Sequence, residues 1–525
     1  MGHSKLQQDP LVRASITVSN DCRVSYRMAS MNQGMLWSLS FVLAAAVGWI
    51  VRRTIQSRAD SQRTGGPVLY PVVGNVFDFL RNSHRFLEWS TEYVINSPSN
   101  TFTTGRFGST FKITGNPATV EHILKTNFEN YPKGEHLRQS LTDLLGDGIF
   151  NVDGELWKIQ RKLASFEFTT RSLREFLMDS LADEVHSRLL PTLASVSRDG
   201  KEIDLQDLFM RFNFDNICKL SFGVDPACLD PSFPEVKFAQ AFDKATTLST
   251  LRFQKIHPLV WKLMRALNVG PERELKEVLD VVNEFAVSVV QKRREEKGRV
   301  NQDLLSRFIG LDSTSFSDEF LRDIIISFVL AGKDTTAVSL SWFFWLLSNH
   351  PGVQQEIIRE VGSIVAKGSN RPFTYKELRD MVYLQAALCE SMRLYPPVPI
   401  DTKVVKNSDV LPDGNCVEKG MKVSYHVYAM GRMESLWGKD CLEFKPERWI
   451  QDGQFVEVSP FKFPVFQAGP RVCLGKEMAM LQMKYVVAAL VPKFELVVVG
   501  KEEPCYGINM TLIMKDGLPV VPKLR

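Results

Sequence analysis

Cysteine is scarce in this chain of 525 residues, and its eight cysteines are scattered. They form no C-x-x-C pair and have no histidine close by in the sequence, so neither a zinc site nor a disulfide framework is expected. A reducing compartment is the simplest setting for such a chain. The cysteines are Cys22, Cys218, Cys228, Cys389, Cys416, Cys441, Cys473 and Cys505.

The chain also lacks the glycine-rich fingerprints of nucleotide-binding proteins, since neither G-x-G-x-x-G nor G-x-x-x-x-G-K-[ST] occurs. No flavin or nicotinamide site is therefore expected, and any redox electrons must come from another protein. The net charge is only +4, and no dense basic stripe with interleaved aromatics is present, so nucleic acid is not an expected partner. No Gly/Ser linker, charge block or repeat divides the chain, which indicates one large catalytic domain behind an anchor.

The anchor is predicted from an uncharged stretch between Met28 and Val51. Residues 35–51 are apolar enough to cross the hydrocarbon core of a bilayer as a helix. Arg52 and Arg53 follow directly, and the positive-inside rule then places the C-terminal bulk on the cytosolic side. We expect a tail over 1–34, a transmembrane anchor over 35–51, a basic and proline-rich linker over 52–75 and the large catalytic domain over 76–525.

A cleaved signal peptide is the alternative interpretation of the apolar stretch. A signal-peptidase site needs small residues just after the apolar run, whereas Trp49, Ile50 and two arginines stand there, which favours an anchor. Residues 1–34 are either a genuine tail or an upstream extension of the translated sequence.

Cys473 lies in a glycine-rich loop ahead of a helix-forming run. The segment reads FPVFQAGPRVCLGKEMAMLQMKYVVAAL, with Phe466, Gly469, Arg471 and Gly475 around the cysteine. The N-terminus of the following helix and the charge of Arg471 favour a thiolate, and the glycines allow backbone amides to approach the sulfur. An isolated free cysteine is usually an inert core residue, but these surroundings favour a metal-bound thiolate.

A second feature is the apolar run over residues 318–351, which predicts one very long buried helix. Ala331 and Gly332 leave one turn without bulk, where a flat ligand could lie against the backbone. Asp334 and Thr335 follow at once in an otherwise apolar setting. A mid-helix threonine can bond the carbonyl four residues earlier, here that of Ala331, and so open a polar notch. The alternative is a harmless back-bonded threonine beside a solvated aspartate.

The pattern F-x-x-G-x-R-x-C-x-G around Cys473 resembles the haem-binding loop of the cytochrome P-450 superfamily. This resemblance implies a mainly α fold, with a large helical haem domain and a small β-rich region. It also implies that Cys473 is the axial ligand of a haem b iron and that Arg471 pairs with a haem propionate. The segment AGKDTT resembles the family's oxygen-activation motif, so Asp334 and Thr335 would deliver protons to bound dioxygen. That motif favours a monooxygenase over a haem isomerase or a non-catalytic haem carrier.

Glu390 and Arg393 form an E-x-x-R pair on one helix face. Four other E-x-x-R pairs occur, and only the order of motifs distinguishes this one, because LYPPVP and then FKPERW follow it. The resemblance implies that Arg448 joins the pair, since a buried ion pair needs further hydrogen bonds to offset its desolvation. Trp449 stands where the family more often has phenylalanine, a change expected to leave the ion pairs intact.

Trp157 and Arg161 share the W-x-x-x-R spacing with Trp49/Arg53 and Trp261/Arg265, so the pattern alone is weak. Their position after GDGIFNVDG, and before the long helix, matches the family's usual order. The resemblance implies that both side chains point toward a haem propionate.

The resemblance covers the chain from about Gly66 to its end. The segments GDGIFNVDGELWKIQRKLASFEF and RLYPPVPIDTKVVKNSDVLPDG look like those of plant members that hydroxylate fatty acids at the terminal carbon. One plant branch instead oxidises amino-acid conjugates of jasmonate, so both alternatives are acyl substrates. An apolar channel over 130–148 and around 324–331 is expected to hold such a chain.

The resemblance further implies dioxygen as co-substrate and NADPH-cytochrome P-450 reductase as electron donor. The reductase is expected to dock on the cysteine side, where Lys476 and Lys484 would contribute positive charge. Membrane lipid is the remaining expected partner, with the protein spanning the endoplasmic reticulum membrane once and its catalytic domain in the cytosol.

Overall fold

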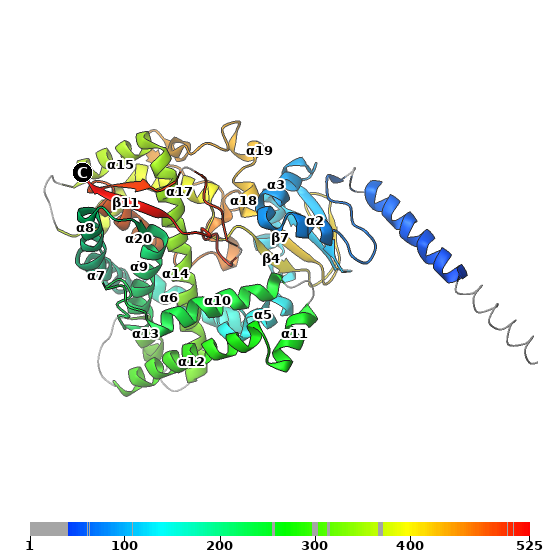
Figure 1. The fold of residues 1–525 in the computed structure, drawn as a ribbon, viewed down its shortest axis with the longest axis horizontal. Helices are drawn as coiled ribbons and strands as arrows, with labels where there is room; N and C mark the ends of the chain where they lie inside the picture. The colour runs from blue at the N-terminus through cyan, green and yellow to red at the C-terminus, as the bar shows by residue number, and fades with distance from the viewer. Residues whose placement is uncertain are drawn as a thin grey trace, which may run out of the picture.

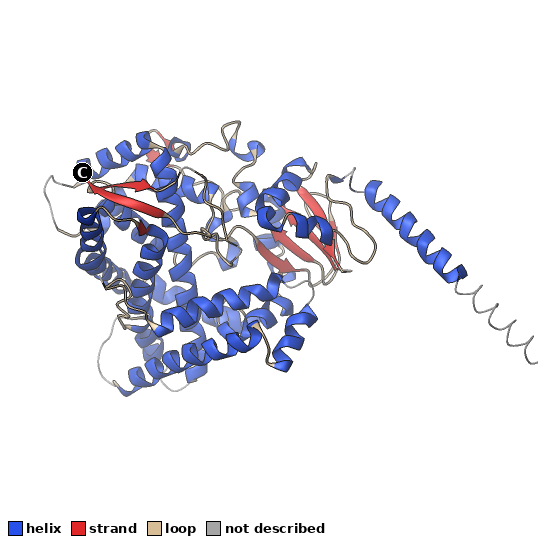
Figure 2. Cartoon of the chain, in the orientation of Figure 1, coloured by secondary structure: helices blue, strands red, loops and turns tan. Residues whose placement is uncertain are grey.

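The computed structural model describes residues 40–59, 61, 64–107, 109–230, 232–254, 258–296, 303–311, 316–365, 371–500, 502–507 and 509–525. These residues form a mainly helical body with small sheets, as the sequence predicts (Figure 2). A four-stranded sheet lies on the side from which helix 40–59 projects, and a three-stranded sheet lies near the C-terminus (Figure 1).

The helices of the body are numbered from α2 because α1 is the N-terminal helix. They are α2 (Val76–Arg81), α3 (Phe86–Asn96), α4 (Pro117–Glu121), α5 (Glu135–Leu145), α6 (Gly154–Phe168), α7 (Arg171–Glu184), α8 (Leu190–Asp199), α9 (Leu205–Phe222), α10 (Lys237–Gln254), α11 (Pro258–Leu267), α12 (Pro271–Glu295), α13 (Leu304–Leu311), α14 (Asp318–Asn349), α15 (Pro351–Ile364), α16 (Tyr375–Asp380), α17 (Val382–Leu394), α18 (Val427–Met430), α19 (Glu434–Trp437) and α20 (Lys476–Leu490).

The strands are short and mostly antiparallel. They are β1 (Thr101–Arg106), β2 (Ser109–Thr114), β3 (Ile203–Asp204), β4 (Asp401–Val404), β5 (Asp409–Val410), β6 (Cys416–Val417), β7 (Lys422–Tyr425), β8 (Ile450–Gln451), β9 (Gln454–Phe455), β10 (Phe494–Val498) and β11 (Pro519–Leu524). The four-stranded sheet has the order β1-β2-β7-β4, and β2 pairs with β7 in parallel. Segments far apart in sequence therefore meet in this sheet.

Helix α14 runs through the body as one continuous element of 32 residues. The side chain of Ser317 accepts a hydrogen bond from the Phe320 amide and caps its start. It ends at Asn349, just before Pro351, whose ring is compatible with the first turn of α15. Over its most apolar window α14 has a mean hydropathy of 1.4, yet 78% of that window is buried, as expected for a core helix. The long buried helix predicted from the sequence is confirmed.

The N-terminal helix is far more exposed than α14. Residues 40–59 are helical, and large apolar side chains such as Phe41, Leu43 and Ile55 are exposed. The predicted anchor over 35–51 begins outside the described residues, as does the whole tail over 1–34. The helix continues past Arg52 and Arg53, because nothing in the segment RRTIQSRA interrupts it.

Candidate active site

The Cys473 loop connects two short 3-10 turns to the start of α20. The turns are Pro464–Phe466 and Gly469–Arg471, and the Cys473 amide donates a hydrogen bond to the Phe466 carbonyl at 2.8 Å. Gly469 has φ +64°, and a Cβ built there would lie 2.0 Å from the Leu124 carbonyl oxygen. Only glycine fits this position, so the loop is held against the segment His122–Thr126 by close backbone contact.

The Cys473 sulfur lies at the N-terminus of α20. Burial raises the pKa of the Cys473 thiol, whereas the amides of Gly475 and Lys476 and the charge of Arg161 lower it. The side chain is nevertheless exposed to solvent. Both observations fit a sulfur that faces an internal space lined by protein. A metal cation bound there would stabilise the thiolate further.

Arg471 brings the predicted propionate partners together. Its guanidinium lies 4.4 Å from the Trp157 ring and donates to Asp153 at 2.7 Å and to the Val152 carbonyl at 3.0 Å. Arg161 lies one turn of α6 beyond Trp157, and its charge acts on both Arg471 and Cys473. The structure thus gathers Trp157, Arg161, Arg471 and Cys473 in one region.

Two lysines that the sequence analysis did not identify belong to the same region. Burial and the charge of Lys403 lower the pKa of Lys133 to about 7, with Arg471 adding to the effect. Lys403 donates to Asp401 at 2.7 Å. Although burial opposes ionisation, Lys403 and Lys133 hold the pKa of Asp401 well below its ordinary value.

The charges of this region do not balance. Arg161, Arg471 and Lys403 supply three cations, and Lys133, whose pKa is about 7, adds a partial fourth, while Asp153 and Asp401 supply two carboxylates. Like charges gathered in a partly desolvated site destabilise one another unless an anion joins them. Haem b carries two propionates, so the excess of positive charge beside an accessible cysteine sulfur fits this cofactor.

Helix α14 carries the other predicted residues. The Thr335 hydroxyl donates to the Ala331 carbonyl at 2.6 Å, which is the back-bond expected for a threonine at this position. A Cβ built on Gly332 would lie 2.6 Å from Ile217 Cδ1, so the missing side chain lets α9 approach α14. Gly332 therefore has a packing role between helices, and its contact with haem stays a prediction.

Asp334 is buried and ion-paired rather than solvated. Lys333 donates to Asp334 at 3.0 Å and also binds Asp243 of α10. Although burial opposes the charge, Asp334 and Asp243 raise the pKa of Lys333 above its ordinary value. The ion pairs link α14 to α10, and the proton-delivery role of Asp334 stays a prediction.

The structure brings Glu390, Arg393 and Arg448 together in a buried cluster. Arg393 binds both oxygens of Glu390 at 2.8 Å, and Arg448 Nε donates to Glu390 Oε1 at 3.2 Å. Arg393 also donates to the Glu443 carbonyl at 2.9 Å, so its charge is well hydrogen-bonded. The indole of Trp449 donates to Glu390 Oε2 at 2.8 Å, a bond that phenylalanine could not make.

The competing copies of these motifs lie in other surroundings. Glu356 and Arg359 form an ion pair whose arginine side chain is mostly exposed. Arg138 binds Asp147, and Arg322 binds Asp323 and Asn283. Trp261 is buried against Arg252, and Arg265 binds Asp143. Arg299 lies outside the described residues.

Comparisons with known proteins agree with this geometry. The family model described as Cytochrome P450 matches residues 64–519. Cytochrome P450 94A2 of Vicia sativa is 48% identical over 478 residues, covering 88% of this chain and 92% of that protein. Cytochrome P450 94B1 of Arabidopsis thaliana is 44% identical over 507 residues, covering 94% and 98%. The chain belongs to the cytochrome P-450 family.

Membership of the cytochrome P-450 family establishes the class of chemistry. The chain is an oxidoreductase of the monooxygenase type that binds haem b through a cysteine thiolate and contains no flavin or nicotinamide domain. As in the family generally, electrons come from a redox partner, and dioxygen and a small-molecule substrate are consumed. The agreement with plant relatives at this level of identity confirms the resemblance stated from the motifs.

One expectation about the cysteine side of this cytochrome P-450 is wrong. Lys484 is buried and donates to the Leu378 carbonyl at 2.9 Å and to Gln385 at 3.0 Å, and burial lowers its pKa to about 8. Its apolar helix face in α20 packs into the core, so Lys484 cannot present charge to a partner. Lys476 is exposed, and its contribution of positive charge to reductase docking stays a prediction.

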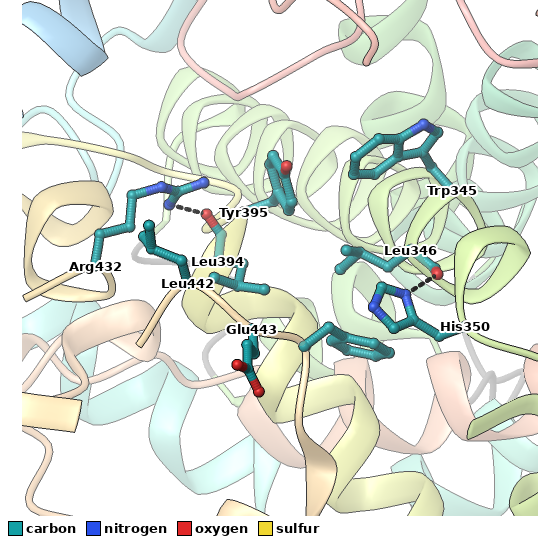
Figure 3. A pocket seen from close by; sticks show the side chains of 9 residues that line it. Trp345, Leu346, His350, Leu394, Tyr395, Arg432, Leu442 and Glu443 are labelled. Atoms are coloured by element: carbon teal, nitrogen blue, oxygen red, sulfur yellow. Dashed lines mark hydrogen bonds between the residues drawn. The ribbon is translucent and has the colours of Figure 1, made fainter. Parts of the chain in front are cut away.

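A separate pocket of about 480 Å³ opens at the C-terminal end of α14, and Figure 3 shows Trp345, Tyr395 and Arg432 around it. None of the residues predicted for the haem site lines this pocket. Arg432 binds the Leu394 carbonyl there and lies 5.2 Å from the Tyr395 ring, so its charge is already engaged.

Proposed function

We propose that this chain is a haem-thiolate monooxygenase of acyl substrates, with Cys473 as the axial ligand of haem b and terminal hydroxylation of fatty acids as its activity. The observation that carries the haem assignment is the accessible Cys473 sulfur beside an unbalanced cluster of cations. Bound haem supplies the iron at which dioxygen is activated by electrons from outside.

The chain's own residues have distinct roles in this proposal. Arg161, Arg471, Lys133 and Lys403 hold the propionates, and the amides of Gly475 and Lys476 stabilise the Cys473 thiolate. The Thr335 hydroxyl, which donates to the Ala331 carbonyl in the structure, supplies a proton in this proposal. Asp334, which accepts a hydrogen bond from Lys333 at 3.0 Å, serves as the neighbouring proton acceptor and donor.

The fatty-acid assignment is supported by the plant relatives and by the apolar elements near α14. Leu141, Leu144 and Leu145 of α5 are buried, as are Ile324 and Phe328 of α14. Amino-acid conjugates of jasmonate are the alternative substrates, and a haem isomerase or haem carrier is the alternative class. Asp334 and Thr335 favour the monooxygenase over both, because peroxide rearrangement needs no proton delivery to dioxygen.

We also propose a single-pass anchor in the endoplasmic reticulum membrane, with the catalytic domain in the cytosol beside NADPH-cytochrome P-450 reductase. Helix 40–59 exposes its apolar side chains along its length. Exposed apolar residues also gather on α11, where Leu263 and Leu267 are each exposed by more than half. Such surfaces are stable against lipid and costly in water.

The test combines haem-loaded protein, the reductase, NADPH and fatty acids of 12 to 18 carbons, with jasmonoyl conjugates run alongside. Terminal hydroxylation of the fatty acids supports the proposal, whereas full haem content with no oxygenated product from any acyl substrate contradicts it. In the Thr335→Ala variant we expect normal haem content, continued oxygen consumption and roughly tenfold or greater loss of product per oxygen consumed. Ser339→Ala removes another back-bond of α14, to the Thr335 carbonyl, and is the control.

A further inference from the structure

A second group of basic side chains lies on the four-stranded sheet, and among the described residues no carboxylate forms an ion pair with Arg106 or Lys422. Arg106 at the end of β1 places its guanidinium 4.0 Å from the Phe79 ring and 5.8 Å from the Phe111 ring. Lys422 at the start of β7 places its ammonium 5.3 Å from the same Phe111 ring. Phe111 of β2 is the register partner of Lys422, so all three side chains share one face of the sheet.

Two further basic side chains approach this face from helices. His136 lies in the first turn of α5, and its pKa is lowered by burial, by Lys422 and by Lys262. Lys262 of α11 donates to Gln139 of α5 at 2.7 Å, which fixes α11 beside α5. The Val404 amide of β4 donates to the Pro132 carbonyl at 2.8 Å, which places the segment before α5 beside this sheet. We call Arg106, Lys422 and Lys262, together with the His136 imidazole, whose charged form the two lysines disfavour, the cation cluster.

The cluster contrasts with other lysines of the same sheet. Lys112 points to the opposite face, where it donates to Thr103 at 2.8 Å and to Asn415 at 2.9 Å. Lys403 binds Asp401. For Arg106 and Lys422, no carboxylate of the described residues lies within ion-pair distance, and no acidic charge offsets their burial.

Burial lowers the pKa of Lys422 to about 8, with Arg106 adding to the effect, and burial also lowers the pKa of Arg106. Half-buried cations that repel one another and lack hydrogen-bond acceptors are unfavourable unless an anion binds between them. A guanidinium and an ammonium that lie near the same Phe111 ring, with the charge of one acting on the other, offer hydrogen-bond donors to a carboxylate.

The surroundings indicate that the anion belongs to an amphiphile. Phe79 and Phe111 line the cluster, and exposed apolar side chains such as Phe77 and Leu263 lie on the neighbouring helices α2 and α11. A small inorganic anion would gain nothing from these groups, whereas an acyl chain attached to the anion would be shielded from water by them.

Helix α5 leads from the cluster toward α14. Its 11 residues span about 16 Å, which is comparable to an extended long acyl chain. The chain after α5 packs tightly on α14, because a Cβ built on Gly148 would lie 2.2 Å from Ser327 Oγ. Ser327 is about one helical turn before Ala331.

We propose that the cation cluster binds the carboxylate of the acyl substrate and so directs its methyl end toward the haem. This inference rests on the proposed acyl hydroxylation and gives a physical reason for oxidation at the terminal carbon. Arg106 and Lys422 are positioning residues for the substrate, remote from the reacting atoms.

The test compares a saturated fatty acid with its methyl ester of the same chain length. Binding to the haem-loaded enzyme in detergent is measured from the substrate-induced change in haem absorption. The wild type is expected to bind the acid more tightly than the ester. Lys422→Gln and Arg106→Gln should each weaken acid binding by roughly tenfold, with ester binding unchanged. Lys422→Arg should restore the preference, and Lys419→Gln, at an exposed position in the turn three residues before β7, is the matched control.

A regiochemical measurement accompanies the binding data. Loss of the carboxylate contact in Lys422→Gln or Arg106→Gln should move part of the hydroxylation from the terminal carbon to inner carbons of the acyl chain. The reason is that the methyl end of the substrate is no longer held in place. Haem content shows whether each variant is folded. Lys422→Gln and Arg106→Gln test the same contact from different strands, so if one variant misfolds, the other still tests the inference.

Three outcomes would overturn the inference and can be told apart. If wild type binds acid and ester equally, the carboxylate is not recognised. If the preference for acid is the same in Lys422→Gln and Arg106→Gln as in wild type, the cation cluster does not bind the substrate carboxylate, although the proposed acyl hydroxylation stands. If the variants lose only binding to vesicles containing anionic phospholipid, the ligand is a lipid headgroup. A wild type that binds neither compound contradicts the proposed function itself.

Discussion

The Glu390 carboxylate accepts hydrogen bonds from Arg393, Arg448, the Lys445 amide and the Trp449 indole. A buried carboxylate between two guanidiniums is stable only when its oxygens are fully bonded, because the desolvation cost of each charge is large. Trp449 therefore bonds to the ion-pair cluster directly. A phenylalanine at this position is still expected to leave the Arg393 and Arg448 contacts in place, but it would remove the indole hydrogen bond to Glu390.

Trp449→Phe is expected to lower the free energy of unfolding by about 1–3 kcal/mol, since a buried hydrogen bond to a charged group is lost while Arg393 and Arg448 stay in place. Denaturant unfolding of the haem-loaded protein measures this. Trp345→Phe, at a half-buried position outside the cluster, is the control. Equal stability of Trp449→Phe and wild type would show that water replaces the indole.

Lys133 should make the stability of the haem-free chain depend on pH. Its pKa falls from 10.5 to about 7 on folding, so the unfolded chain binds the proton more tightly, and folding is disfavoured by this group below pH 7. As pH rises from 7 to about 10.5, that penalty disappears. Lys133→Met should thus raise the melting temperature most below pH 7 and hardly at all near pH 10, while weakening haem binding. A difference that is independent of pH would contradict this assignment.

The sequence identified Cys473, Arg471, Trp157 and Arg161 because each belongs to a local pattern in a recognisable order. It could not identify Lys133 and Lys403, since no local pattern marks them. They meet because the Val404 amide donates to the Pro132 carbonyl and joins the segment before α5 to the edge of the sheet. Such a contact depends on the fold and not on spacing.

Among the elements, α14 was predictable because its apolar run is long and Pro351 limits it. The packing role of Gly332 could not be predicted from the sequence, because the side chain that it contacts, Ile217, lies on α9, far away in the sequence. The short strands were also beyond prediction in detail, since β2 and β7 owe their pairing to the folded body and not to strand patterning.

Gly332→Ala is expected to destabilise the protein by about 1–3 kcal/mol, because its Cβ would meet Ile217 and push α9 away from α14. Adding Ile217→Ala should recover part of that loss in a double-mutant cycle. Gly310→Ala in α13 is the matched control, since a Cβ there meets nothing within 4 Å, and it should be neutral or slightly stabilising. Additive effects of Gly332→Ala and Ile217→Ala would contradict the packing role.

At the scale of the whole molecule, the mainly helical fold that the family resemblance implied is confirmed, and the division into tail, anchor, linker and catalytic domain stays a prediction. In the proposed membrane attachment, two surfaces contact lipid, helix 40–59 and the exposed apolar residues of α11. A protein lacking residues 1–61 is therefore expected to retain weak binding to lipid vesicles.

Leu263→Asp with Leu267→Asp in that shortened protein should abolish the remaining binding, because both side chains are largely exposed and a charge there opposes insertion. Vesicle sedimentation measures the bound fraction, and haem content shows that the fold is retained. If the shortened protein with intact leucines is already fully released, α11 has no part in membrane binding.

The central claim is that Cys473 supplies the thiolate ligand of haem iron in this cytochrome P-450. The most direct measurement is the absorption spectrum of the reduced, carbon-monoxide-bound protein, compared between wild type and Cys473→Ser. The account predicts that wild type shows the thiolate-ligated form and that Cys473→Ser loses it, with Cys441→Ser unchanged because Cys441 is buried in another cluster. A Cys473→Ser protein that binds haem and keeps the wild-type spectrum would contradict the account.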